Sequence, residues 1–509
     1  MHGFESVLIL LVAAVALTAC ARYLKLPYPS LLALGGVALA FVPAAPDLAL
    51  DPQLTLALFV APVLLDAAFD TSLRDLKRFW IPVLSLVVFA VGITTIAVAW
   101  LAHRMVPGMP WAAAIALGAI VAPPDAAAAN AILRQLRMPH RVVVILEGES
   151  LLNDATALLI YRLAVSAATG TAFTSASIAP AAFAIVASVV VGFVLSHLYV
   201  RAVERVTDIP SAIILQFVGC FGVWILADET GLSAIVTLVT FAITASRLTP
   251  ARTPAHMRVP SYAVWETVVF VLNVLAFVLI GLQVRPILES LEADERTHYL
   301  QVAGAVFAIV VIVRIAWVFT YNRAAYYKNK FFGPGYWPGK FVPPVSGSAI
   351  VSWCGMRGIV TLATAYALPR AFPFRDLILL CAFGVVVGTL IVQGLTLRPL
   401  IRAFKLKYDG TVEKEVRTAQ EALAEIATRI LDGDGSPTAK VLREEFAVQK
   451  LEEITEGTES ERDARNRLRS SVVTAQRLEL IRLRDEAVIG DDAFHRVEER
   501  LDWTEINAR

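Results

Sequence analysis

The sequence predicts an all-α membrane protein with about 13 transmembrane helices followed by a helical cytosolic tail. Its 509 residues are 57% hydrophobic and 17% charged, with a mean hydropathy of +0.65, whereas soluble domains are about 45–50% apolar and about 25% charged. Residues 401–509 hold 43 of the 89 charged side chains. We therefore expect a membrane domain over residues 1–400 and a cytosolic tail over 401–509, for which a regulatory role is one hypothesis.

Apolar windows of about 20 residues can cross a bilayer as helices. Thirteen occur here, at residues 3–21, 28–44, 52–70, 79–103, 111–133, 142–168, 177–200, 209–227, 231–246, 262–284, 300–321, 346–369 and 377–399. The loops on one side of these windows carry 17 Lys and Arg residues, and the loops on the other side carry 5. Because basic residues prefer the cytoplasmic side, we expect a multi-pass protein of the cell inner (plasma) membrane with an exterior N-terminus and a cytoplasmic tail.

Two of the windows contain residues that interrupt a helix. The fifth contains Pro123-Pro124-Asp125, where tandem prolines remove two amide donors, and the twelfth contains Gly355-Met356-Arg357-Gly358. These are the fifth and twelfth of 13 windows, so they lie seven windows apart. This spacing suggests two inverted six-helix repeats with two broken, crossing helices. Paired broken helices at matching places indicate a transport site near the middle of the membrane.

The sixth window holds the densest set of ionisable residues, in the run Glu147-Gly148-Glu149-Ser150-Leu151-Leu152-Asn153-Asp154. Helical spacing places Glu149 near Asn153 and Ser150 near Asp154. Asp154 lies twelve residues into the window, about 18 Å at 1.5 Å per residue, close to the middle of a hydrocarbon core about 30 Å thick. A carboxylate at that depth is costly and indicates a functional site.

Asp125 fits two compatible roles, a helix N-cap after Pro124 and an ion ligand, and the Pro124 carbonyl, freed from the helix, is a second candidate ligand. Arg357 either neutralises the negative ends of the half-helices or pairs with a buried acid such as Glu149. Asp66, towards the end of the third window, fits a structural cap and a site role about equally well.

Arg314, deep in the eleventh window, is expected to anchor another buried acid.

The seven histidines and four cysteines show no metal-ligand spacing, and no nucleophile–base pair appears. We therefore expect no cofactor and no enzymatic activity. No basic stripe indicates nucleic-acid binding.

With these residues the chain resembles the monovalent cation:proton antiporters of the first cation/proton antiporter family, which includes bacterial sodium/proton antiporters. The resemblance covers about residues 5–400. It is carried by the segments 122–129, 147–157 and 353–358, and by the segment around Pro62-Val63-Leu64-Leu65-Asp66, where the family more usually has Glu.

The resemblance implies a homodimer in which a core domain moves against a dimerisation domain in the lipid. Asp154 would bind either a cation or a proton, with Asn153 as its partner. A Na⁺ or K⁺ ion would be held by Asp125, Ser150 and Asp154, joined by the Pro124 carbonyl and Asp66. The implied structural ion pair joins Glu149 and Arg357.

The expected function is therefore exchange of Na⁺, K⁺ or Li⁺ for H⁺ by alternating access, serving pH homeostasis. Burial disfavours the charged form of a carboxylate, so that protons and cations can compete for it. Electrogenic members of the resembling superfamily carry two adjacent acids where this chain has Asn153 and Asp154, so we expect electroneutral exchange. A K⁺-selective antiporter is the main alternative, and an organic-solute symporter or an ion channel fits the acidic, clustered site less well.

Overall fold

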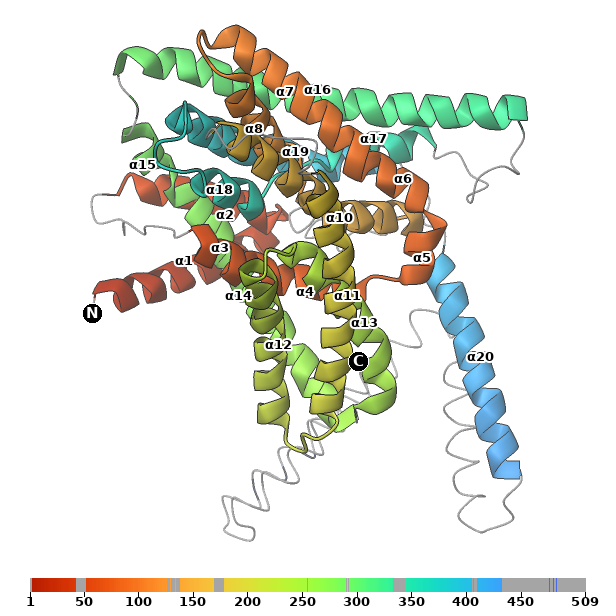
Figure 1. Ribbon diagram of the computed structural model, residues 1–509. Helices are drawn as coiled ribbons and strands as arrows, with labels where there is room; N and C mark the ends of the chain where they lie inside the picture. Colours follow the sequence, from red (N-terminus) through yellow and green to blue (C-terminus); the bar gives the residue numbers. More distant parts are fainter. Residues whose placement is uncertain are drawn as a thin grey trace. The chain divides into compact units, whose positions relative to one another are not determined.

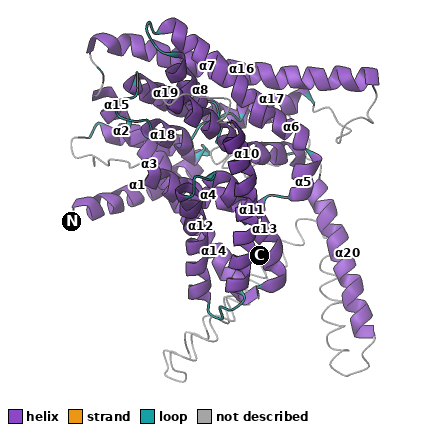
Figure 2. Ribbon diagram, in the orientation of Figure 1, coloured by secondary structure: helices purple, strands orange, loops and turns teal. Residues whose placement is uncertain are grey.

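The computed structural model describes residues 2–42, 52–125, 138–168, 178–253, 255–289, 293–332, 344–404 and 410–432, with the single positions 129, 133, 291, 406, 476, 479 and 482. The described residues form helices, turns and loops, and no strand occurs among them (Figure 2). They divide into two compact units, residues 1–410 and 411–509. The expected domain boundary after residue 400 lies inside the last helix of the first unit.

Among the first ten helical segments of unit 1, two continuous helical stretches each contain a short π-helix. One stretch covers residues 52–70 and the other covers residues 80–105. The segments are α1 (His2–Leu24), α2 (Tyr28–Ala40), α3 (Pro52–Thr55), η1 (Leu56–Val60), α4 (Ala61–Asp70), α5 (Leu73–Arg78), α6 (Trp80–Leu84), η2 (Ser85–Ala90), α7 (Val91–Met105) and α8 (Trp111–Val121) (Figure 1).

The remaining helices of unit 1 follow after a segment that lies mostly outside the described residues. They are α10 (His140–Ala168), α11 (Ile178–Val203), α12 (Ile209–Glu229), α13 (Ala234–Arg252), α14 (Ala255–Leu282), α15 (Val284–Glu289), α16 (Ala293–Phe332), α17 (Val345–Trp353), α18 (Ile359–Tyr366) and α19 (Arg375–Phe404). In unit 2 the structure describes α20 (Thr411–Asp432), with an apolar stripe of exposed residues that includes Val416, Leu423 and Ile430.

Each of the 13 apolar windows contains at least one helix of the structure. Among the described residues, six helical stretches are long and apolar enough to cross a membrane: Trp80–Met105, Phe183–Val203, Ile209–Glu229, Met257–Glu289, Arg296–Phe331 and Arg375–Phe404. Shorter apolar helices occupy four of the other windows. The arrangement of 13 spans as inverted repeats stays a prediction.

Small residues allow close helix crossings in this unit. A Cβ atom on Gly36 of α2 would overlap the carbonyl oxygen of Val278 in α14, and one on Gly281 would overlap the carbonyl oxygen of Ala33. Helices in lipid gain contact by such close approach, since the hydrophobic effect does not drive them together. α10, which carries the acidic run, packs against α8, α13 and η2 (Figure 1).

Both predicted helix breaks coincide with interruptions in the structure. α8 ends at Val121, just before the tandem prolines, and the second half of this window lies mostly outside the described residues. The twelfth window forms α17 and α18, separated by a non-helical stretch over residues 354–358. The two interruptions lie side by side, because the Asp125 N–H donates to the Met356 carbonyl at 2.7 Å.

Candidate functional site

Arg357 neutralises the carbonyl end of α8. Its guanidinium donates to the carbonyls of Val121 at 3.0 Å and Ala122 at 3.1 Å, and also to that of Gly355. Its backbone N–H donates to the Thr389 hydroxyl at 3.0 Å. The Arg357 side chain is 1% exposed. A cation at the negative end of a helix is stabilising, so Arg357 holds the two interruptions together through the backbone.

Arg314 is the partner of Glu149. Its guanidinium binds the carboxylate with both arms, at 2.5 and 2.8 Å, and both side chains are 3% exposed or less. The same guanidinium donates to the carbonyls of Val351 and Cys354 at the end of α17. The expected Glu149–Arg357 pair is therefore wrong as a direct contact. Arg357 uses its donors on backbone carbonyls, whereas Arg314, from a helix distant in sequence, reaches Glu149 with bidentate geometry.

The two glycines of the second interruption are required by space. A Cβ atom on Gly355 would lie 2.5 Å from Cδ of Arg314 and 3.0 Å from Nη1 of Arg357, so this glycine lets both guanidinium groups approach. A Cβ atom on Gly358 would overlap the Asp125 carboxylate. Neither glycine has a positive φ. Close packing, and not a backbone conformation open only to glycine, therefore requires a glycine at both positions.

Asp125 lies at the start of α18. Gly358 is the N-cap of that helix, and the Asp125 carboxylate packs directly against it. A negative charge at a helix N-terminus is favoured by the peptide dipoles. The sequence suggested the helix following Pro124 as the one that Asp125 faces, but that segment lies mostly outside the described residues. The helix end observed beside Asp125 belongs to the other interruption.

Asn153 binds the first interruption from α10. Its Nδ2 donates to the Pro124 carbonyl at 2.7 Å. Because a carbonyl can only accept, the amide orientation follows from this contact. The opposite atom, Oδ1, is buried and has no hydrogen-bond partner among the described residues. The Pro124 carbonyl is thus held in place, with a second lone pair still able to contact a cation.

Four of the six predicted site residues line one cavity of about 420 Å³, whereas Asn153 and Pro124 are not part of its wall. Asp154, which is 8% exposed, lines it together with Asp125, Ser150 and Asp66. On α10 the lining positions are 147, 150, 151 and 154, which is one helical face that ends at Asp154. The cavity therefore reaches Asp154 along the first half of α10, from the end that begins at His140.

The cavity has polar residues that the sequence analysis did not select. Glu266 and Asn273 of α14 line it, as do Asp70 at the end of α4 and Glu147. Glu266 interrupts an otherwise apolar window, and that is the signal by which it could have been found. Asp70 lines the same cavity as Asp66.

The donor set is one of oxygens. The lining includes the carboxylates of Asp154 and Asp125 and the hydroxyl of Ser150, and oxygen ligands suit hard cations. Within the described part of the chain, no three His, Cys, Asp or Glu side chains gather closely enough to hold a metal ion. The arrangement thus fits an exchangeable cation held in part by the Ser150 hydroxyl and backbone oxygens.

The family model described as "Sodium/hydrogen exchanger, transmembrane" matches residues 8–403. The chain belongs to this family. Its members are multi-pass membrane transporters that exchange monovalent cations for protons, and they are not enzymes.

Two relatives show the range of similarity. A "Sodium, potassium, lithium and rubidium/H(+) antiporter" of Bacillus pumilus (strain SAFR-032) is 30% identical over an alignment of 464 positions that covers 85% of this chain and 66% of that protein. The "Low-affinity Na(+)/H(+) antiporter NhaS1" of Synechocystis sp. is 27% identical over 89% of this chain and 86% of its own. The chain thus spans about two thirds of the length of the first relative.

A solved structure is similar in fold. The sodium proton antiporter MjNhaP1 from Methanocaldococcus jannaschii at pH 8 superposes with a TM-score of 0.57 at 16% identity, covering 80% of this chain and 98% of that one. At that identity the likeness concerns the fold alone.

Proposed function

We propose that this antiporter exchanges Na⁺ or another monovalent cation for H⁺, with the two ions competing for Asp154. The observation that carries the proposal is the burial of Asp154 at the end of a cavity that Asp125, Ser150 and Asp66 also line. A buried carboxylate without a fixed cationic partner is stabilised either by a proton or by a cation. The buried cations Arg314 and Arg357 are engaged by Glu149 and by backbone carbonyls.

The remaining contacts suit a division of roles. Asp154, Asp125 and Ser150 would ligate Na⁺ or K⁺ directly, and Asp66 would contact the ion from the opposite wall. Asn153 would act by holding the Pro124 carbonyl toward the site, since its Nδ2 is hydrogen-bonded to that oxygen. Glu149, Arg314 and Arg357 would preserve the geometry of the interruptions without touching the ion.

Alternating access is supported by the one-sided cavity. On α10 the wide space ends at Asp154. Among the described residues, Asp154 also borders a separate small void of about 10 Å³ that Pro123, Ala157 and Thr364 line. An ion could therefore leave Asp154 in one direction in this conformation. The charge distribution of the loops supports a cytoplasmic position for the wide opening. Movement of a core domain within a homodimer, in the plasma membrane, completes the proposal.

We further propose exchange of one cation for one proton. Asn153 cannot titrate, and its amide is committed to the Pro124 carbonyl. Asp125 is held at the N-terminus of α18, which favours its charged form throughout the cycle. Asp154 would then be the one site residue on α10 that takes up and releases a proton.

The choice of cation is left to experiment, and the names of relatives support a broad range. The Bacillus pumilus relative is named for sodium, potassium, lithium and rubidium. Carboxylate and hydroxyl oxygens bind Na⁺, K⁺ and Li⁺ alike. Membership of the exchanger family sets aside the symporter and channel alternatives.

The deciding experiment compares Asp154→Asn with a matched control in proteoliposomes. An amide keeps the shape of the side chain but cannot release a proton, so Na⁺-driven proton flux should fall to the background of empty vesicles. The control is Asp228→Asn on α12, whose carboxylate is 47% exposed and lies 3.6 Å from Arg162; it should exchange at the wild-type rate. Flux of Asp154→Asn within twofold of wild type would show that the ions bind elsewhere.

A further inference from the structure

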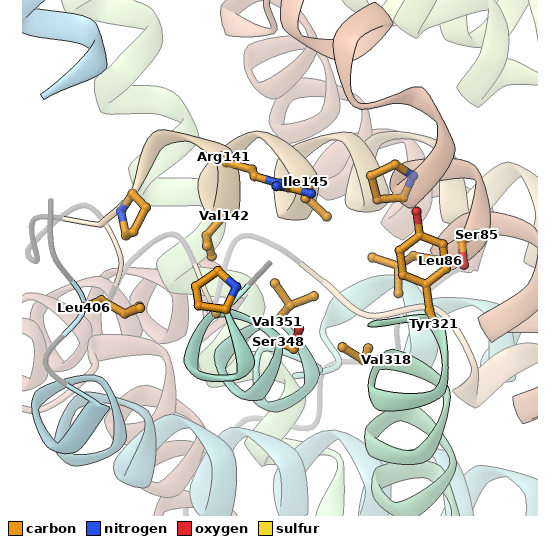
Figure 3. A pocket seen from close by; sticks show the side chains of 14 residues that line it. Ser85, Leu86, Arg141, Val142, Ile145, Val318, Tyr321, Ser348, Val351 and Leu406 are labelled. Atoms are coloured by element: carbon orange, nitrogen blue, oxygen red, sulfur yellow. The ribbon is translucent and has the colours of Figure 1, made fainter. Parts of the chain in front are cut away.

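A second cavity, separate from the ion site, lies where α6, α10, α16 and α17 meet. Its volume is about 90 Å³, several times what one water molecule needs. Figure 3 shows Arg141, Val142 and Ile145 of α10 along one side, with Val318, Ser348 and Val351 opposite. Apart from a few groups at its edge the wall is aliphatic and proline-rich. An apolar cavity of this kind favours a hydrocarbon over water.

The cavity lies at the depth where acyl chains begin. A candidate membrane span starts at Trp80, and this side chain is 47% exposed, as is typical of the aromatic belt at a membrane interface. Pro82, Ser85 and Leu86 of the same span line the cavity. Leu86 is six residues past Trp80, so the wall extends about 9 Å inward at 1.5 Å per residue.

Two arginines lie close to one aromatic ring at the level of Trp80. The guanidinium carbon of Arg78 lies 5.7 Å from the centre of the Phe79 ring, and that of Arg141 lies 5.4 Å from the same centre. Arg141 also lines the cavity. The nearby acid on α5, Asp75, is engaged by Arg74 and His140. Two guanidinium groups on one ring form a local positive charge that a phosphate would complement.

We propose that this corner binds an anionic phospholipid, with the phosphate between Arg78 and Arg141 and part of an acyl chain in the cavity. The lipid would come from the leaflet next to the loops rich in arginine and lysine. It would join α6 to α10 and α17, which are the helices that carry Asp154 and precede the second interruption. The exchange rate would then depend on anionic lipid, through a site that the ion does not touch.

The test measures the thermal midpoint of the purified protein in neutral detergent during titration with phosphatidylglycerol. Phosphatidylcholine with the same chains tests the need for a net negative charge, and inorganic phosphate tests the need for a chain. For the wild type, only phosphatidylglycerol should raise the midpoint at low concentration. An equal effect of phosphatidylcholine would refute the role of the arginines, and an equal effect of phosphate would refute the role of the cavity.

Two variants and one control locate the site. The double variant Arg78→Gln/Arg141→Gln should require about thirtyfold more phosphatidylglycerol for the same shift, because two basic contacts are lost. Arg201→Gln/Arg205→Gln makes the same charge change on exposed residues at the end of α11 and should titrate like the wild type. Equal loss in both double variants would refute a local site.

A third variant tests the cavity without altering charge. It also keeps the proposal testable if the double arginine variant does not fold. Val318→Phe fills the space from α16. It should weaken the phosphatidylglycerol effect and leave the midpoint without lipid close to that of the wild type. An unchanged titration of Val318→Phe would show that no acyl chain enters the cavity.

Discussion

Arg314→Ala should destabilise the membrane unit strongly, because it strands a buried carboxylate. Arg314 supplies both hydrogen bonds in the ion pair with Glu149, and both side chains are 3% exposed or less. It also donates to the carbonyls of Val351 and Cys354. Removal of one partner from such a pair costs about 3–5 kcal/mol, mostly as the penalty for an uncompensated charge.

The expected shift in melting temperature follows from the size of the unit. Unfolding entropy is about 2.1 cal/mol/K per residue. For a unit of 410 residues, the melting temperature therefore falls by about 1 °C for each 0.9 kcal/mol of unfolding free energy that is lost. Arg314→Ala should therefore lower the midpoint by about 4–6 °C. The measurement is a thermal melt of purified protein in one detergent, followed by intrinsic fluorescence.

A matched control separates burial from charge. Arg285→Ala removes an arginine from an ion pair of similar length, 2.7 Å to Glu289, but those side chains are 47% and 64% exposed. Exposed pairs of this kind contribute about 0.3–0.5 kcal/mol, so the midpoint should move by less than about 1 °C. The double variant Glu149→Leu/Arg314→Met removes both charges and should melt above Arg314→Ala. If Arg314→Ala melts like Arg285→Ala, the buried pair does not stabilise the fold as argued.

Three further predictions concern the ion site and its surroundings. Gly358→Ala should reduce exchange at least tenfold, because the new Cβ overlaps the Asp125 carboxylate; wild-type flux in liposomes would contradict that packing. With fixed Na⁺ and pH gradients, the reversal point should be the same at two clamped membrane potentials, and a shift with voltage would make Asp125 a second proton carrier. Outside the membrane, burial would raise the pKa of Asp75, but hydrogen bonds from His140, Arg74 and Ser72 outweigh it and the pKa lies below 3.8. A carboxyl group whose pKa is lower in the folded than in the unfolded state stabilises the fold at pH values above its unfolded-state pKa. This stabilisation is lost as the pH falls through the folded-state pKa. Asp75→Asn should thus lower the melting temperature at neutral pH, and the difference from wild type should shrink as the pH falls below about 4. An equal melting temperature of the two proteins at neutral pH would refute the assignment.

The sequence by itself determined the class of protein and indicated candidate residues for the ion site. Windows of 20 apolar residues are a strong signal, because an exposed backbone in lipid must satisfy its hydrogen bonds within a helix. Tandem prolines and an intramembrane Asn-Asp pair are equally local signals, which require no knowledge of the fold. Asp154, Asp125 and Ser150 were selected in this way, and they do line one cavity.

Only the tertiary structure decided which charges meet. Glu149 had two candidate arginines, and hydropathy ranks Arg314 and Arg357 alike because both lie deep in apolar windows. The choice depends on which helix passes α10 within reach, and helix packing sets this through close crossings such as that of Gly36 with Val278. The close approach at Gly358 and the cavity wall at Glu266 have the same origin. Each of these contacts joins residues more than 100 positions apart, so no local sequence pattern predicts it. The physical reason is that helix packing decides which side chains of a bundle meet.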